Sequence, residues 1–73
     1  MTRLTDYREK TGLTQKQFAI ECGWGKAQGR IGNYESGRRQ PVINDMRLIV
    51  STLQRLGVNC VLDDVFPPKD SAA

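Results

Sequence analysis

The sequence predicts an all-α fold, a compact bundle of four to five helices. Apolar residues recur at helical spacing, most clearly in the stripe Met46, Ile49, Val50, Leu53 and Leu56. Glycines at positions 12, 23, 37 and 57 follow the predicted helices, as helix-ending residues commonly do. At 73 residues the chain forms one domain, and because a chain of about 60 residues buries only ~60% of its unfolded surface, a helical bundle or a dimer is favoured.

Composition excludes several classes of protein. No apolar run reaches the ~18 residues needed to cross a bilayer, and the first ten residues lack the apolar core of a signal peptide, so we expect a cytoplasmic protein with no membrane partner. The chain has no histidine, and Cys22 and Cys60 are not a CxxC pair, so neither a metal site nor a cofactor is predicted. Without a nucleophile–base pair or room for a pocket that binds a small-molecule ligand, we expect no enzyme.

Basic charge is concentrated in the first part of the chain. Residues 1–41 hold eight Lys and Arg against four Asp and Glu, whereas residues 42–73 hold three against four. A basic surface of this kind is typical of proteins that bind nucleic acid. The same asymmetry can arise by chance in a short chain, so it counts only as support.

The first helix is expected over residues 2–11, where Leu4 and Tyr7 share a face. The next helix has the clearest start, because Thr14 and Gln17 fit a capping box in which each side chain binds the other residue's backbone amide. The apolar stripe that follows consists of Phe18, Ala19 and Cys22. This helix ends at Gly23, and Trp24 is expected to return to the core.

The following helix is expected to run from Lys26 or Ala27 to Ser36, with a narrow apolar stripe at positions 27, 31 and 34. Its two interior glycines, at positions 29 and 32, each cost about 1 kcal/mol against alanine, which suggests close approach of the backbone to another surface. The alternative is a longer turn, with the helix starting at Arg30.

A further helix is predicted from Asn44, as N-cap, through the stripe that ends at Leu56. Residues 58–66 then form either a short helix capped by Asn59 or an extended segment. The apolar side chains of this segment exceed what a four-helix core needs, so we expect it to mediate dimerisation; the side chains concerned are Val58, Val61, Val65 and Phe66. We assign residues 1–66 to the domain and expect residues 67–73 to be a disordered tail.

The stretches LTQKQFA and GRIGNYESGRRQP, at positions 13–19 and 29–41, resemble the helix-turn-helix of phage Cro and repressor proteins and their bacterial relatives. The resemblance covers residues 4–57 and implies a lambda repressor-like fold, with the helix-turn-helix at Thr14–Ser36. Six residues separate Trp24 from Ile31, two more than the family usually has, so the register of the residues that reach DNA is open by about one position.

The candidate base-reading residues are Lys26, Gln28, Gly29, Arg30 and Asn33. Amide and guanidinium groups near the start of a helix in the major groove discriminate bases by ~1–3 kcal/mol each. The resemblance implies that Gln28 and Asn33 contact bases, with Gly29 between them bringing backbone close to the groove. For each of these residues the alternative is an ordinary surface position.

Phosphate contacts are expected from Gln15 and Gln17, at the start of the helix after Thr14, and from Arg38 and Arg39 in the basic loop. The resemblance also implies a structural ion pair between Arg8 and Glu35. The alternatives are a solvated loop for the two loop arginines and full exposure for Arg8 and Glu35.

Together these features predict a transcriptional regulator that binds double-stranded DNA as a homodimer on a palindromic operator, in the manner of a Cro-like or repressor-like protein. The alternative is an antitoxin with a toxin as its main partner and DNA binding as a secondary property. The sequence does not identify the operator or the genes controlled.

Overall fold

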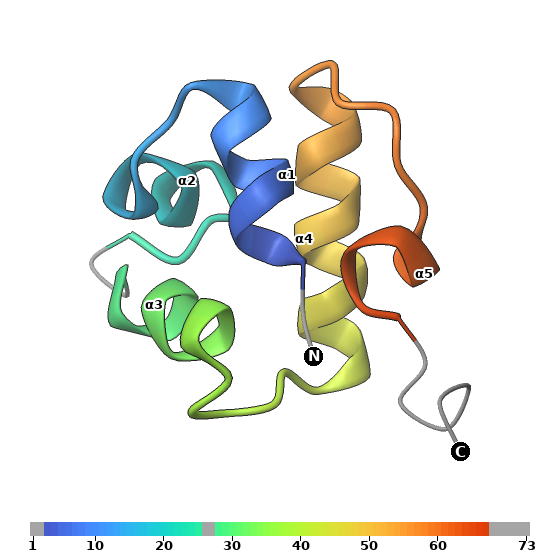
Figure 1. Ribbon diagram of the computed structural model, residues 1–73. Coiled ribbons are helices and arrows are strands. Elements are labelled where there is room, and N and C mark those ends of the chain that lie inside the picture. Colours follow the sequence, from blue (N-terminus) through green and yellow to red (C-terminus); the bar gives the residue numbers. More distant parts are fainter. Residues whose placement is uncertain (1–2, 26–27, 68–73) are drawn as a thin grey trace.

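The computed structural model describes residues 3–25 and 28–67. Within these residues it contains helices only, which confirms the predicted all-α class. In Figure 1, α2 and α3 pack against each other on one side of α4, and α5 lies on the other side. The helices are α1 (Leu4–Thr11), α2 (Gln15–Glu21), α3 (Gln28–Ser36), α4 (Ile43–Arg55) and α5 (Leu62–Val65).

Every helix contributes to one hydrophobic core, and α1 contacts both α3 and α4. The predicted apolar stripes supply most of this core, including the stripe of α4, whose Met46 and Leu56 pack at its edge. Trp24 also packs against the core, as expected. The side chains with no exposed surface are Leu4, Phe18, Ala19, Ile31, Ile49, Leu53 and Val65.

The capping box at the start of α2 forms as predicted. The Thr14 hydroxyl accepts a hydrogen bond from the Gln17 amide at 3.1 Å, and the Gln17 side-chain oxygen accepts one from the Thr14 amide at 2.9 Å. At the other end, Gly23 has a φ of 85°, a left-handed conformation that favours glycine. The chain therefore leaves α2 sharply, and the Trp24 amide donates back to the Ala19 carbonyl at 2.9 Å.

The predicted start of α4 was wrong by two residues. The N-cap is Val42, in an extended conformation, and not Asn44, which is exposed within the first turn. Pro41 is buried and fixes the chain just before Val42, whose carbonyl accepts from the Met46 amide at 3.0 Å. Packing of this loop therefore outweighed the preference of asparagine for the cap position.

The structure describes α3 from Gln28 onward, so the alternative start at Arg30 was wrong. Lys26 and Ala27, the predicted first residues, lie outside the described residues, as do Thr2 in the expected first helix and the tail from residue 68 onward.

Residues 58–66 combine the two predicted alternatives. The chain is not helical as far as Val61, and only Leu62–Val65 forms a helix, so Asn59 is not its cap. Instead, the Asp64 carboxylate accepts from the Val61 amide at 2.9 Å. Three of the four apolar side chains predicted to exceed the needs of the core, at positions 58, 65 and 66, are buried in it, and only Val61 is exposed, at 58%. The prediction that these three side chains exceed what the core needs was therefore wrong.

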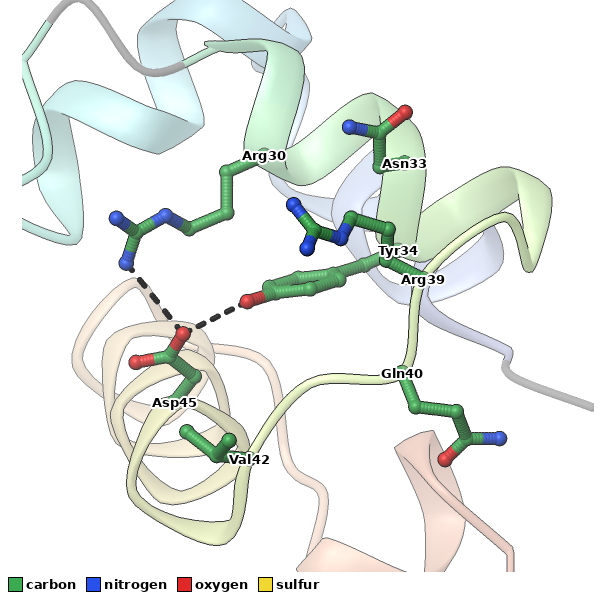
Figure 2. Close-up of a pocket in the computed structure, with 7 residues that line it drawn as sticks. All are labelled: Arg30, Asn33, Tyr34, Arg39, Gln40, Val42 and Asp45. Carbon is green, nitrogen blue, oxygen red and sulfur yellow. Dashed lines mark hydrogen bonds and ion pairs between the residues drawn. The ribbon is translucent and has the colours of Figure 1, made fainter.

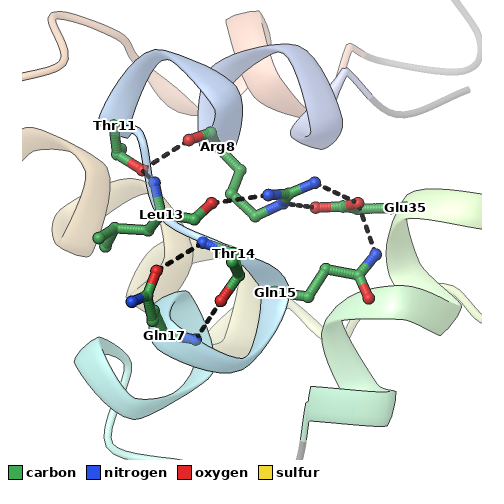
Figure 3. A network of polar contacts seen from close by, with 7 residues as sticks. All are labelled: Arg8, Thr11, Leu13, Thr14, Gln15, Gln17 and Glu35. Carbon is green, nitrogen blue, oxygen red and sulfur yellow. Dashed lines mark hydrogen bonds and ion pairs between the residues drawn. The ribbon is translucent and has the colours of Figure 1, made fainter.

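An ion-pair network holds α3 against α1 and the start of α2 (Figure 3). The Arg8 Nε lies 2.5 Å from Glu35 Oε2, and its Nη1 donates to the Leu13 carbonyl at 2.7 Å. Gln15 Nε2 donates to Glu35 Oε1 at 2.9 Å. The side chains of Arg8 and Glu35 are only 13% and 6% exposed. The orientation of α3 is therefore fixed by a nearly buried carboxylate near its end.

Glu35→Gln is expected to lower the free energy of unfolding by roughly 3 kcal/mol, the low end of the cost of breaking a buried ion pair from one side, because Arg8 keeps some exposure. Urea denaturation measures this loss. The control is Glu21→Gln, which removes the exposed pair between Arg55 and Glu21 and should cost less than about 1 kcal/mol. Equal losses in both variants would show that the Arg8–Glu35 pair is not a main contribution to holding α3 against α1.

Val65→Ala is expected to destabilise the fold by roughly 2 kcal/mol, because the Val65 side chain is fully buried and its removal leaves a cavity. Val61→Ala is the matched control in the same segment, and its effect should be near zero since Val61 is exposed. Chemical denaturation distinguishes the two. A negligible loss for Val65→Ala would show that α5 does not contribute to the core.

Candidate nucleic-acid interface

The face of α3 that points away from the core is built of small residues. Ile31 and Tyr34 are buried, so helical geometry directs Gly29, Asn33 and Ser36 to the opposite face. Gly29 is exposed, and a Cβ added to it would meet no atom within 4 Å. A flat partner can therefore come close to the backbone of α3 along this face.

Gln15 of α2 lies beside this face. A Cβ at Gly32 would sit 3.3 Å from Gln15 Oε1, so glycine at position 32 leaves room for the Gln15 carboxamide. One amide proton of Gln15 is used by Glu35. Gln17 is exposed, with its side-chain oxygen occupied by the capping box and its amide nitrogen still able to donate.

Arg30 lies on the flank of α3 that faces α4 (Figure 2). Its guanidinium carbon is 4.6 Å from the centre of the Trp24 ring, a cation–π contact. Its Nη1 is 3.4 Å from Asp45 Oδ2. Arg30 therefore lies on a different side of α3 from Gly29, although it lines the same hollow as Asn33.

Tyr34 connects α3 to α4 through the same carboxylate oxygen. Its hydroxyl donates to Asp45 Oδ2 at 2.7 Å. Burial raises the pKa of Tyr34 above its ordinary value, and the hydrogen bond and charge of Asp45 raise it further, so the phenol remains protonated at neutral pH. The Tyr34 ring also makes an edge contact with Trp24, at 6.3 Å between ring centres. These two aromatic side chains pack with the core.

The loop after α3 places further cations beside the helix. The Arg39 amide donates to the Asn33 carbonyl at 3.2 Å, and the Arg38 amide donates to the Ser36 hydroxyl at 3.3 Å, so the loop folds back on the end of α3. Both arginine residues are exposed. An open hollow of about 450 Å³ lies between α3, the loop and the start of α4, lined by Arg30, Asn33, Tyr34, Arg39, Gln40, Val42 and Asp45.

Two candidate base-reading positions are not fully described. Gln28 is the first residue of α3, but its side chain is not among the described parts, and Lys26 lies outside the described residues. What the structure brings together is the outward face of α3, Gln15 beside it and the two loop arginines at its end. The part of the hollow formed by Gln40, Val42 and Asp45 was missed by sequence reasoning, because no local pattern places the start of α4 beside Arg30.

The described residues contain no group of three or more histidine, cysteine or acidic side chains that could hold a metal ion. None of the helices in this part of the chain has both the length and the apolar character that a membrane span requires.

Comparison with known families gives one match. The model of a helix-turn-helix domain matches residues 2–59, which include α2, the turn and α3. No curated protein and no solved structure matches the chain. The match covers most of the sequence and agrees with the resemblance to Cro and repressor proteins. The chain therefore belongs to the helix-turn-helix domain family.

Proposed function

We propose that this protein is a transcriptional regulator that binds specific sequences in duplex DNA, with α3 in the major groove. The observation that carries the proposal is the outward face of α3, which has little relief and is flanked by cations, in a chain of the helix-turn-helix family. A helix of this kind can lie deep in the groove, because Gly29 on its outward face adds no side chain between the backbone and the bases.

Base recognition is assigned to Gln28 and Asn33. Both carry a carboxamide, which can donate to N7 and accept from N6 of adenine at the same time. Asn33 lies on the outward face, one turn after Gly29. Arg30 is directed toward α4 and is not included in this assignment.

Phosphate contacts are assigned to Arg38 and Arg39, and to the amide groups of Gln15 and Gln17. The two arginine side chains are exposed at the end of α3 and follow the groove-facing residues directly. Contacts of this kind set the affinity and the position of the protein on DNA, and they do not distinguish sequences.

We also propose that the protein binds a palindromic operator as a homodimer, like Cro and repressor proteins. A single module of this size contacts few base pairs, and two half-sites would supply the specificity. In the C-terminal segment, Val61 at the start of α5 supports a dimer contact because it is apolar and 58% exposed.

Affinity for a duplex selected from a random library should fall steeply with salt, by a log–log slope of about −0.9 for each phosphate contact. Asn33→Ala should lower affinity for the selected site by about 1–3 kcal/mol and relax base preference at one position in each half-site. Arg38→Ala should instead weaken selected and scrambled duplexes by the same factor. Fluorescence anisotropy measures all three quantities.

A salt-independent affinity would contradict the DNA-binding proposal. Identical behaviour of Asn33→Ala and Arg38→Ala would contradict only the division between base and phosphate contacts.

Sedimentation of the intact protein tests the dimer. The wild type should sediment as a dimer, and Val61→Asp should shift it toward monomer with an unchanged helical circular dichroism spectrum, because the new charge is exposed in the monomer and buried in the dimer. Ile20→Asp is the matched control, since Ile20 is an exposed apolar residue on α2, at 53%. A dimer that survives Val61→Asp would move the interface to another surface.

A further inference from the structure

The Arg30 guanidinium contacts two side chains, the Trp24 ring and the Asp45 carboxylate. It stacks on Trp24, but its contact with Asp45 is long, at 3.4 Å, against about 2.7–2.9 Å for a good charge-assisted hydrogen bond. The oxygen it approaches already accepts from Tyr34 at 2.7 Å. The Arg30 side chain is also 43% exposed, so solvent screens its attraction to Asp45. The contact with Asp45 is therefore one that water or another anion can replace at little cost.

The hollow beside Arg30 has the chemistry of a phosphate site. Arg39 lines it together with Arg30, and both guanidinium groups carry several N–H donors. Figure 2 shows the guanidinium groups of Arg30 and Arg39 on the same side of the loop, near Tyr34, whereas the Gln40 side chain points away from them. The hollow adjoins the loop that carries Arg38, so a DNA backbone that contacts the two loop arginines would pass its opening. Asp45 is the acidic residue among those that line it.

We propose that this hollow receives one backbone phosphate of DNA, and that Arg30 exchanges Asp45 for this phosphate while it stays stacked on Trp24. The proposal rests on the proposed DNA-binding function. It makes Arg30, which the sequence pattern assigned to base reading, a phosphate contact instead. In it, Asp45 is a positioning residue. It keeps Arg30 folded toward α4 in the free protein and competes with phosphate for the guanidinium.

This competition lowers affinity for every DNA sequence by a similar factor. Asp45 cannot follow Arg30, because its carboxylate is bound by Tyr34 and lies in the first turn of α4, where the helix dipole favours a negative charge. A phosphate that enters the hollow must therefore compete for Arg30 with the Asp45 carboxylate, which stays where it is. For duplexes that fit poorly against α3, no other contacts would offset the affinity lost to competition from Asp45.

Binding of a short mixed-sequence duplex tests the exchange without knowledge of the operator. Asp45→Asn should tighten binding by about threefold to fivefold at low salt, the scale of an exposed ion pair. The new amide oxygen can still accept from Tyr34, so the fold should be retained, which thermal unfolding verifies. Asp63→Asn is the control for net charge, because it removes an exposed carboxylate from α5, and its effect should be less than about twofold.

Arg30→Gln provides the second arm. It should weaken binding to mixed-sequence and selected duplexes by the same factor, and it should reduce the salt slope by about 0.9, the loss of one phosphate contact. In the Arg30→Gln background, the gain from Asp45→Asn should become smaller, because no guanidinium remains to be released.

Three results would overturn the proposal. The first is no gain for Asp45→Asn, and the second is an equal gain with and without Arg30, which would mean that Asp45 acts only by repelling DNA. The third is a loss for Arg30→Gln that is confined to the selected duplex, which would make Arg30 a base-reading residue. If the wild type binds neither duplex at low salt, the proposed function fails together with this inference; in the other three cases the proposed function stands.

Discussion

The orientation of α3 depends first on the carboxylate of Glu35. Arg8 and Gln15 both donate to it, so a single side chain joins α1, α2 and α3. A helix of nine residues with two glycines has little stability of its own. Tertiary contacts must therefore supply what the local sequence lacks. The nearly buried position of Glu35 makes these contacts strong, because the surrounding protein screens charges less than water does.

Tyr34, the neighbour of Glu35 in the sequence, secures α3 on its other flank through Asp45. Successive residues of a helix point about 100° apart, so these two side chains reach different helices from adjacent positions. Ile31 fills the space between them in the core. With three positions fixed in this way, the outward face needs no large side chains for stability. Glycine, asparagine and serine can occupy it, which is the surface that close approach to DNA requires.

Local signals predicted the parts of the structure that local interactions determine. The Thr14 capping box and the apolar stripe of α4 involve residues within one or a few turns, and both are found as expected. The Asn44 cap was wrong because the burial of Pro41, a tertiary effect, sets where α4 begins. The place of Arg30 was beyond prediction for the same reason. Its carboxylate partner lies 15 residues away, and its position beside α3 follows only from the packing of α4.

The two ion pairs that flank α3 differ in burial, and this difference separates their roles. Arg8 and Glu35 are 13% and 6% exposed, so breaking their pair leaves a charge that water cannot fully solvate. Arg30 and Asp45 are 43% and 19% exposed and 3.4 Å apart, so Arg30 can be solvated, or bound by another anion, at little cost. In the proposed complex with DNA, the two arginine side chains beside α3 would have different roles. Arg8 holds α3 in place, and Arg30 would be available to a phosphate because its contact with Asp45 is long and partly exposed.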